Sequence, residues 1–208
     1  MKTKPELTFD ESSHRYFLGG LPVPGVTSVL SAAFGDPWKN VPEQQREYAL
    51  GLGRAVHRWC ELVDTGSTSR PTGEHMQGYL AAWENFKREN GLVILAVEKR
   101  VVSYRYRYAG TLDRVCIFEG KKAVLDIKTG QAIHPFAAIQ TAAYAAADNE
   151  MGGQREKVQI RLTVLLKQDG SYIFIPHKDK TDINVFLACL SVMGWKRTQK
   201  LTMEPEVE

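Results

Sequence analysis

The chain has 208 residues, of which 43% are hydrophobic and 25% charged, so its composition is that of a globular protein and excludes wholesale disorder. Its formal net charge of +3 is too small to indicate a nucleic-acid partner by itself. Its three cysteines are far apart, which argues against a disulfide framework and fits a reducing compartment.

The N-terminal segment predicts a small β-hairpin followed by a short helix. Residues 14–18 and 21–23 are strand-like and flank a pair of glycines that would form the turn. The helix is expected to run to Phe34, with Thr27 or Ser28 as its cap. The first residues lead into no long apolar run, so we expect no signal peptide.

Two longer helices are predicted next, at about residues 43–63 and 74–90. Pro42 stands at the start of the first, a favourable place for proline, and Gly91 closes the second. The apolar residues of the first helix recur at helical spacing: Tyr48, Leu52, Val56, Trp59 and Val63.

The second half of the chain predicts an α/β protein with a mixed central sheet and helices packed on it. No stretch of about 18 apolar residues occurs, so no membrane span is expected, and we predict a soluble, cytoplasmic protein. The expected strands lie at residues 92–102, 111–118, 123–128, 157–167 and 172–176. The expected helices lie at residues 135–149 and 179–198, and an acidic tail follows at 199–208.

Two aspartates and a lysine of the predicted 111–128 hairpin are the candidate catalytic residues. Adjacent antiparallel strands can bring Asp113 and Asp126 together, and two carboxylates at one point repel unless a cation lies between them. Strand alternation puts Lys128 on the same face as Asp126, where it could hold a water or contact a phosphate. The carbonyl of Ile127 could be a further Mg²⁺ ligand. Taken alone, an Asp-x-Lys triplet is more often a solvated strand end.

A wider set of motifs resembles a known family of nucleases. The segments are Gly51-Leu-Gly53-Arg-Ala-Val-His57, Glu98, Gly110-Thr-Leu-Asp113, Asp126-Ile-Lys128-Thr and Gln140-Thr-Ala-Ala-Tyr144. Their order and spacing resemble the core of RecB-type nucleases of the PD-(D/E)XK superfamily, a group that includes phage and mitochondrial exonucleases. Leu112 replaces the proline of the superfamily's name, and the second acid is an aspartate; both variants occur in the RecB-like branch.

The resemblance implies a role for each matching residue. Asp113 and Asp126 would bind metal, His57 would be a further ligand, and Glu98 a direct or water-mediated one. Lys128 would be the catalytic lysine. Without the resemblance, His57 is more typical of a structural histidine and Glu98 of a surface charge.

Gln140 and Tyr144 lie one helical turn apart, and the resemblance implies that they support the site and touch the DNA backbone. An ordinary polar edge of an alanine-rich helix is the alternative. The chain lacks the four cysteines that ligate an iron–sulfur cluster in some relatives, so we expect no cluster. Mg²⁺ is the expected ion, with Mn²⁺ able to replace it.

Basic residues outside the centre are candidates for contacts with DNA. Residues 103–108 alternate between aromatic and basic, which as a strand would place Arg105 and Arg107 on one face for phosphates and three tyrosines on the other. Arg54 and Arg58 lie four residues apart on the same predicted helix as His57. A half-buried strand and a solvated helix face are the corresponding alternatives.

The fold implied by the resemblance is α/β, a restriction-endonuclease-like core with an α-helical N-terminal segment and a small leading hairpin. One nuclease domain is expected over 1–208, with parts at 1–40, 41–91, 92–198 and a flexible tail at 199–208.

The expected function is metal-dependent DNA exonuclease activity in phage or prophage recombination or DNA processing, inside a bacterial host cell if the protein is phage-encoded. The expected partners are DNA and a single-strand annealing or other recombination protein. A structure-specific endonuclease, an RNA-directed enzyme and a non-catalytic nucleic-acid-binding relative are the alternatives.

Overall fold

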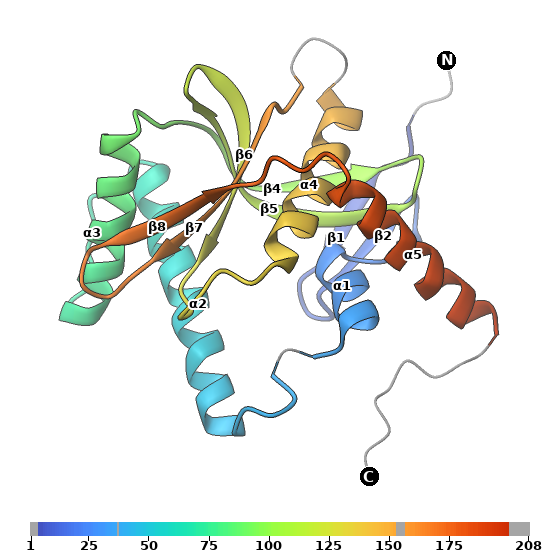
Figure 1. Cartoon of the computed structure of the whole chain (residues 1–208), viewed down its shortest axis with the longest axis horizontal. Helices are drawn as coiled ribbons and strands as arrows, with labels where there is room; N and C mark the ends of the chain where they lie inside the picture. The colour runs from blue at the N-terminus through green and yellow to red at the C-terminus, as the bar shows by residue number, and fades with distance from the viewer. Residues whose placement is uncertain (1–3, 37, 153–156, 200–208) are drawn as a thin grey trace.

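The computed structural model describes residues 4–36, 38–152 and 157–199 of the chain (Figure 1). A small antiparallel sheet comes first, formed by β1 (Leu7–Asp10), β2 (Arg15–Leu18) and β3 (Leu21–Val23). β2 and β3 are the predicted hairpin, and β1 is an addition that the sequence analysis does not anticipate. Residues 200–208 of the expected flexible tail lie outside the described residues.

Three helices follow the small sheet: α1 (Val26–Phe34), α2 (Glu43–Asp64) and α3 (Glu74–Glu89). The predicted caps of α1 were wrong, because Thr27 and Ser28 lie inside the helix and Gly25 occupies the cap position. Gly25 forms an isolated β-bridge with Ala109, and its carbonyl accepts a hydrogen bond from the Val29 N–H, so the helix begins directly where the extended segment ends.

The central sheet has five strands in the spatial order β4-β5-β6-β7-β8, as predicted for a mixed sheet. β6 and β7 are parallel and every other neighbouring pair is antiparallel. The parallel pair needs a crossover, which α4 (Phe136–Gly152) supplies. The strand bounds are Val93–Ser103, Tyr108–Phe118, Lys121–Lys128, Ile160–Leu166 and Tyr172–Pro176.

Helices cover both faces of this sheet. In Figure 1, α2 and α3 lie on one side of it and α1, α4 and α5 (Asp182–Thr198) on the other. Successive side chains of β6 point to opposite faces of the sheet. Leu125 and Ile127 pack in the core with α2 and α3, and Val124 packs in the core with α4. Asp126 and Lys128 therefore lie on the face that α4 covers. The predicted α/β class is confirmed.

The segment expected to alternate as a strand at residues 103–108 is a turn, which corrects that prediction. β4 ends at Ser103 and β5 begins at Tyr108, and these two residues form the last pair between the strands. The Arg107 N–H donates to the Ser103 carbonyl over 2.9 Å, and Arg107 has a φ of +55°. Tyr108 is buried, and its hydroxyl donates to the Ala143 carbonyl, so tertiary packing starts the new strand there.

No helix within the described ranges combines the length and the apolar character needed to cross a bilayer.

Candidate active site

Asp113 and Asp126 face each other across the β5–β6 hairpin. Arg114 and Leu125 form the final pair of the ladder, so the two aspartates come next along it. The ladder opens at that point because the Ile127 N–H donates to Asp113 Oδ2 over 2.6 Å. This charge-assisted bond fixes the Asp113 carboxylate between the two strands.

His57 reaches the same place from α2. Its Nε2 lies 3.0 Å from the Ile127 carbonyl oxygen, which can only accept, so Nε2 carries the proton. The lone pair of Nδ1 is then free and lies 3.6 Å from Asp113 Oδ1. Metal-binding histidines typically donate their second nitrogen in this way. The Ile127 carbonyl, predicted as an extra ligand, is engaged by His57.

Glu98 lies opposite Asp113 in the register of β4 and β5, between the pairs formed by Val97 and Lys99. Its φ of +46° is a left-handed conformation in the middle of a strand, which stores roughly 1–3 kcal/mol of strain. Burial, followed by the charge of Asp113, raises the pKa of Glu98 to about 7, against the opposing effect of His57. The surrounding structure therefore forces this carboxyl toward a neighbour of like charge.

One ligand atom from each of His57, Glu98 and Asp113 falls within a cluster whose atoms all lie within 4.8 Å of one another. Two oxygen donors and one imidazole nitrogen at this separation are a suitable donor set for a divalent cation. An ion between them would relieve the repulsion of the carboxylates.

Asp126 and Lys128 form an ion pair beside this cluster. Lys128 Nζ lies 3.0 Å from Asp126 Oδ1 and 2.9 Å from Oδ2, yet the buried Oδ2 has no hydrogen bond. Burial raises the pKa of Asp126 to about 6, Lys128 opposes that shift, and Asp113 adds to it. Burial alone would lower the pKa of Lys128, but Asp126 and Asp113 outweigh it and raise that pKa. Lys128 is therefore a cation at neutral pH.

A model of the PD-(D/E)XK nuclease superfamily matches residues 65–201. The chain belongs to the PD-(D/E)XK nuclease superfamily. The matched residues include Glu98, Asp113, Asp126 and Lys128, whereas His57 precedes them. Membership implies a hydrolase that acts on nucleic acids.

Solved structures with a similar fold include an alkaline exonuclease from Laribacter hongkongensis, with 14% identity and a TM-score of 0.41 over 86% of this chain and 94% of that one. The same exonuclease in complex with dAMP gives 16% identity and a TM-score of 0.33 over 86% of this chain and 95% of that one. No curated protein matches the chain.

PD-(D/E)XK nucleases use divalent metals, and the residues of this member fit such an ion. The donors are carboxylates and an imidazole, and the buried Oδ2 of Asp126, which accepts no hydrogen bond from the described residues, offers another oxygen. The buried thiols of Cys60 and Cys116 are unsuited to the role, since burial raises the pKa of each to about 12.

Gln140 and Tyr144 of α4 support Lys128. Lys128 Nζ donates to Gln140 Oε1 over 3.3 Å, and Gln140 Nε2 donates to the Tyr144 hydroxyl over 3.2 Å. Tyr144 is only 6% exposed, which favours a supporting role over a contact with the DNA backbone. Gly110 makes room for its ring, because a Cβ there would come 2.6 Å from Tyr144 Cε1. The glycine of the Gly110-Thr-Leu-Asp113 motif thus has a steric explanation.

A buried network behind the site was missed by the sequence reasoning. The side chains of Asp64 and Arg114 are fully buried, and Arg114 Nε donates to Asp64 Oδ2 over 2.7 Å. Lys87 Nζ and Trp83 Nε1 also donate to Asp64, over 2.5 and 3.1 Å. An arginine inside an apolar strand was the signal in the sequence, since a buried arginine requires an acidic partner.

Arg114 connects this network to the candidate metal ligands. Its Nη1 donates to the Asp113 carbonyl over 2.7 Å and lies 3.4 Å from Glu98 Oε1. Arg114 therefore holds the backbone of one acid and contacts the carboxylate of the other, from the side of α2 and α3.

The four predicted DNA-contacting arginines fall into two pairs. Arg54 and Arg58 line a hollow with His57, and Arg58 is paired with Glu61 at 2.7 Å. Arg105 and Arg107 lie in the β4–β5 turn, beyond the end of β4 at Ser103, which is five residues or roughly 16 Å along the strand from Glu98. The structure brings the first pair to the site and leaves the second pair distant from it.

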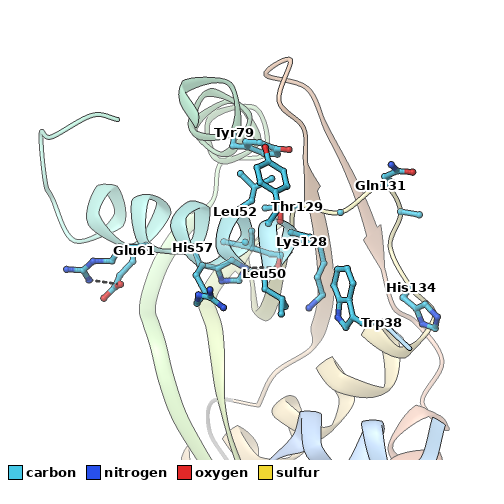
Figure 2. Close-up of a pocket in the computed structure, with 18 of the residues that line it drawn as sticks. Trp38, Leu50, Leu52, His57, Glu61, Tyr79, Lys128, Thr129, Gln131 and His134 are labelled. Carbon is cyan, nitrogen blue, oxygen red and sulfur yellow. Dashed lines mark hydrogen bonds and ion pairs between the residues drawn. The ribbon is translucent and has the colours of Figure 1, made fainter. Parts of the chain in front are cut away.

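The candidate metal ligands and Lys128 border two hollows. One has a volume of about 430 Å³ and is lined by Asp113, Asp126 and Lys128 together with Arg100 and Thr111. The other, of about 930 Å³, is shown in Figure 2, where Lys128 stands between His57 and Trp38. Both hollows share His57, Glu98 and Lys128.

Proposed function

We propose that this chain is a Mg²⁺-dependent DNA exonuclease, with Mn²⁺ able to replace Mg²⁺. The observation that carries the proposal is the His57, Glu98 and Asp113 cluster beside the Asp126–Lys128 pair. Three carboxyl groups share this place with one lysine and one histidine, an arrangement that is stable when a cation joins it.

The proposed reaction is hydrolysis of a phosphodiester. The oxygen of a water, having lost a proton to solvent, forms a bond to phosphorus as the bond from phosphorus to the leaving 3′ oxygen breaks, and that oxygen takes up a proton from solvent. A bound Mg²⁺ supplies a lowered pKa for that water and neutralises charge on the phosphate. His57, Glu98, Asp113 and Asp126 are the residues that would hold it.

Lys128 has the second role in this proposal. Its ammonium group, kept charged by Asp126 and oriented by Gln140, would position the attacking water or donate to a phosphate oxygen as negative charge develops. Asp126 thus serves both the cation and the lysine. A non-catalytic relative would have no need for this full set of groups.

We further propose one nuclease domain over residues 1–208, a role in phage or prophage DNA recombination or processing, and a recombination protein as partner. The chain carries no nucleotide-binding loop of the Walker type, so the nuclease would act without its own motor. Arg54 and Arg58 would contact the phosphates of the bound strand. The distant Arg105 and Arg107 would contact DNA outside the site.

A cleavage assay on end-labelled linear DNA tests the proposal, using Mg²⁺, Mn²⁺ or EDTA, with Asp113→Ala as the control variant. We expect stepwise loss of nucleotides that requires the metal and that Asp113→Ala abolishes. Circular DNA run alongside should stay intact, since an exonuclease needs an end. Cutting of circles would replace the exonuclease assignment with an endonuclease, and metal-independent cutting would contradict the proposed site.

A further inference from the structure

The larger hollow, which borders His57, Glu98 and Lys128, has no role in the hydrolysis described above. Its volume of about 930 Å³ lies in the range typical of ligand pockets. It borders the proposed catalytic residues directly, because His57, Glu98 and Lys128 form part of its wall. A nucleotide whose phosphate reached the metal cluster would have its base within reach of this hollow.

Aromatic side chains form part of the wall of the hollow. Tyr48 belongs to the apolar series of α2, yet it is 67% exposed, whereas Val56, two turns later, is buried in the core. The reason is visible in Figure 1, where the first turns of α2 project beyond the sheet. Trp38 forms another part of the wall, and the turn that carries it is fixed by a 2.9 Å hydrogen bond from its N–H to Asp36.

Positive charge lines the part of the hollow near the metal cluster. Arg54 makes no hydrogen bond or ion pair with any residue in the described ranges, so its guanidinium is available to a ligand. Lys128 lies at the junction with the cluster, and Arg58 is shared with Glu61. The hollow therefore offers both cations and aromatic rings beside the place of the reacting phosphate, which is the combination expected for one nucleotide of a strand.

We propose that this hollow binds an unpaired base of single-stranded DNA, with Trp38 and Tyr48 as its stacking surfaces. The inference rests on the proposed nuclease function and extends it to the substrate: the strand enters the site with a base unpaired. A base within a duplex cannot occupy the hollow, because its faces are covered by neighbouring bases and its edge is paired.

The test is the binding of fluorescent oligonucleotides by variants that all carry Asp126→Asn, so that the DNA stays intact. Trp38→Ala and Tyr48→Ala should each weaken the binding of single-stranded oligothymidine about tenfold, as expected for the loss of one stacked base. Binding of a blunt duplex should not change. Tyr48→Phe keeps the ring and should bind as the parent does, and Trp195→Ala, which removes an exposed tryptophan on α5, should also have no effect.

Oligonucleotides with one abasic position identify the contact itself. At the position that occupies the hollow, loss of the base should weaken binding by the parent about tenfold and leave little further effect for Trp38→Ala. Unchanged single-strand affinity in both alanine variants would overturn the proposal, as would an equal loss for single strands and duplexes.

Cleavage by the wild type in Mg²⁺, measured in parallel, separates the two proposals. If the wild type cleaves DNA and the Trp38→Ala and Tyr48→Ala variants bind it normally, the base pocket is refuted and the nuclease function is not. If the wild type does not cleave DNA but binding depends on Trp38 and on the base, the nuclease function is refuted and the base pocket is supported.

Discussion

Two buried groups of charge in this protein are built in opposite ways. Asp148 of α4 is fully buried and lies 2.6 Å from Lys99 Nζ and 2.8 Å from Lys122 Nζ. Burial raises the pKa of Asp148, but the hydrogen bonds from the two lysines outweigh it, so the net effect is a lowered pKa. Asp126 of β6 is also buried, but among the described residues its one ion-pair partner is Lys128, and its pKa is raised to about 6.

This difference in surroundings distinguishes a structural ion pair, at Asp148, from a candidate functional site, at Asp126. The Asp148 carboxylate, paired with one lysine of β4 and one of β6, is a charge-compensated part of the fold that joins α4 to the sheet. Asp126, Asp113 and Glu98 lie together beside Lys128 and Arg114, and the pKa values of Asp126 and Glu98 stay raised, so the folded chain holds carboxyl groups that the neighbouring cations compensate only in part. Such an imbalance within a folded protein indicates a place where a cation and a substrate complete the structure.

The largest effect is expected for Lys128→Ala, which removes the cation paired with Asp126. Cleavage should fall by about a thousandfold, because the variant lacks the donor that orients the water or the phosphate. Metal binding should persist, whereas the melting temperature of the metal-free protein should fall, because the buried Asp126 carboxylate loses its ion-pair partner. Single-turnover cleavage and calorimetry measure the two quantities. Near wild-type turnover would remove Lys128 from the catalytic residues.

Asp148→Ala removes the carboxylate that pairs with Lys99 and Lys122, and it should lower the stability of the protein rather than its activity. It leaves two lysines without their shared partner, so the free energy of unfolding should drop by about 3 kcal/mol. Denaturant unfolding measures this loss, and the Mn²⁺ affinity of the remaining folded protein should not change. An equal loss of metal affinity would show that the two groups are not independent.

The pH dependence of stability should have opposite signs at the two groups. The folded pKa of Asp126, about 6, lies above its ordinary value of 3.8, so the folded state binds its proton more tightly. Its contribution is therefore fully present below about pH 4 and is lost as the pH rises toward about 6, by roughly 2 kcal/mol. Asp148, with a lowered pKa, contributes above its ordinary value and loses that contribution in acid.

Unfolding of the metal-free protein in EDTA at several pH values measures this contrast. Asp126→Asn should remove part of the fall in stability between about pH 4 and pH 6. The same slope in the variant and the parent would show that Asp126 is not the group that titrates.

The smallest effect is expected for the metal affinity of Asp126→Asn. An amide keeps the shape of the side chain but lacks the negative charge, so binding of Mn²⁺ should weaken by about tenfold. Titration calorimetry on the metal-free protein gives the value, with Asp148→Asn as the matched control at a buried aspartate outside the site. An affinity equal to wild type would exclude Asp126 as a ligand.

Much of the local organisation could be predicted from the sequence, because it depends on short-range patterns. The order of helices and strands follows from hydrophobic periodicity and turn residues. The closeness of Asp113 and Asp126 follows from hairpin geometry, and the shared face of Asp126 and Lys128 follows from strand alternation.

Other features depend on partners that are distant in the chain. Arg114 pairs with Asp64, 50 residues away, and no local sequence pattern predicts that pair. The left-handed backbone of Glu98 exists only because the surrounding sheet and Arg114 hold it. Residues 104–107 carry a strand-like pattern, but the packing of Tyr108 makes them a turn.

The sequence by itself therefore determined which residues could carry the chemistry of this protein, because residue type and spacing are local properties. Only the tertiary structure decided which buried charges are neutralised and which remain open. It alone also decided that Tyr48 faces a hollow rather than the core. Electrostatic balance and exposure are sums over all neighbours in space, and most of those neighbours come from other elements.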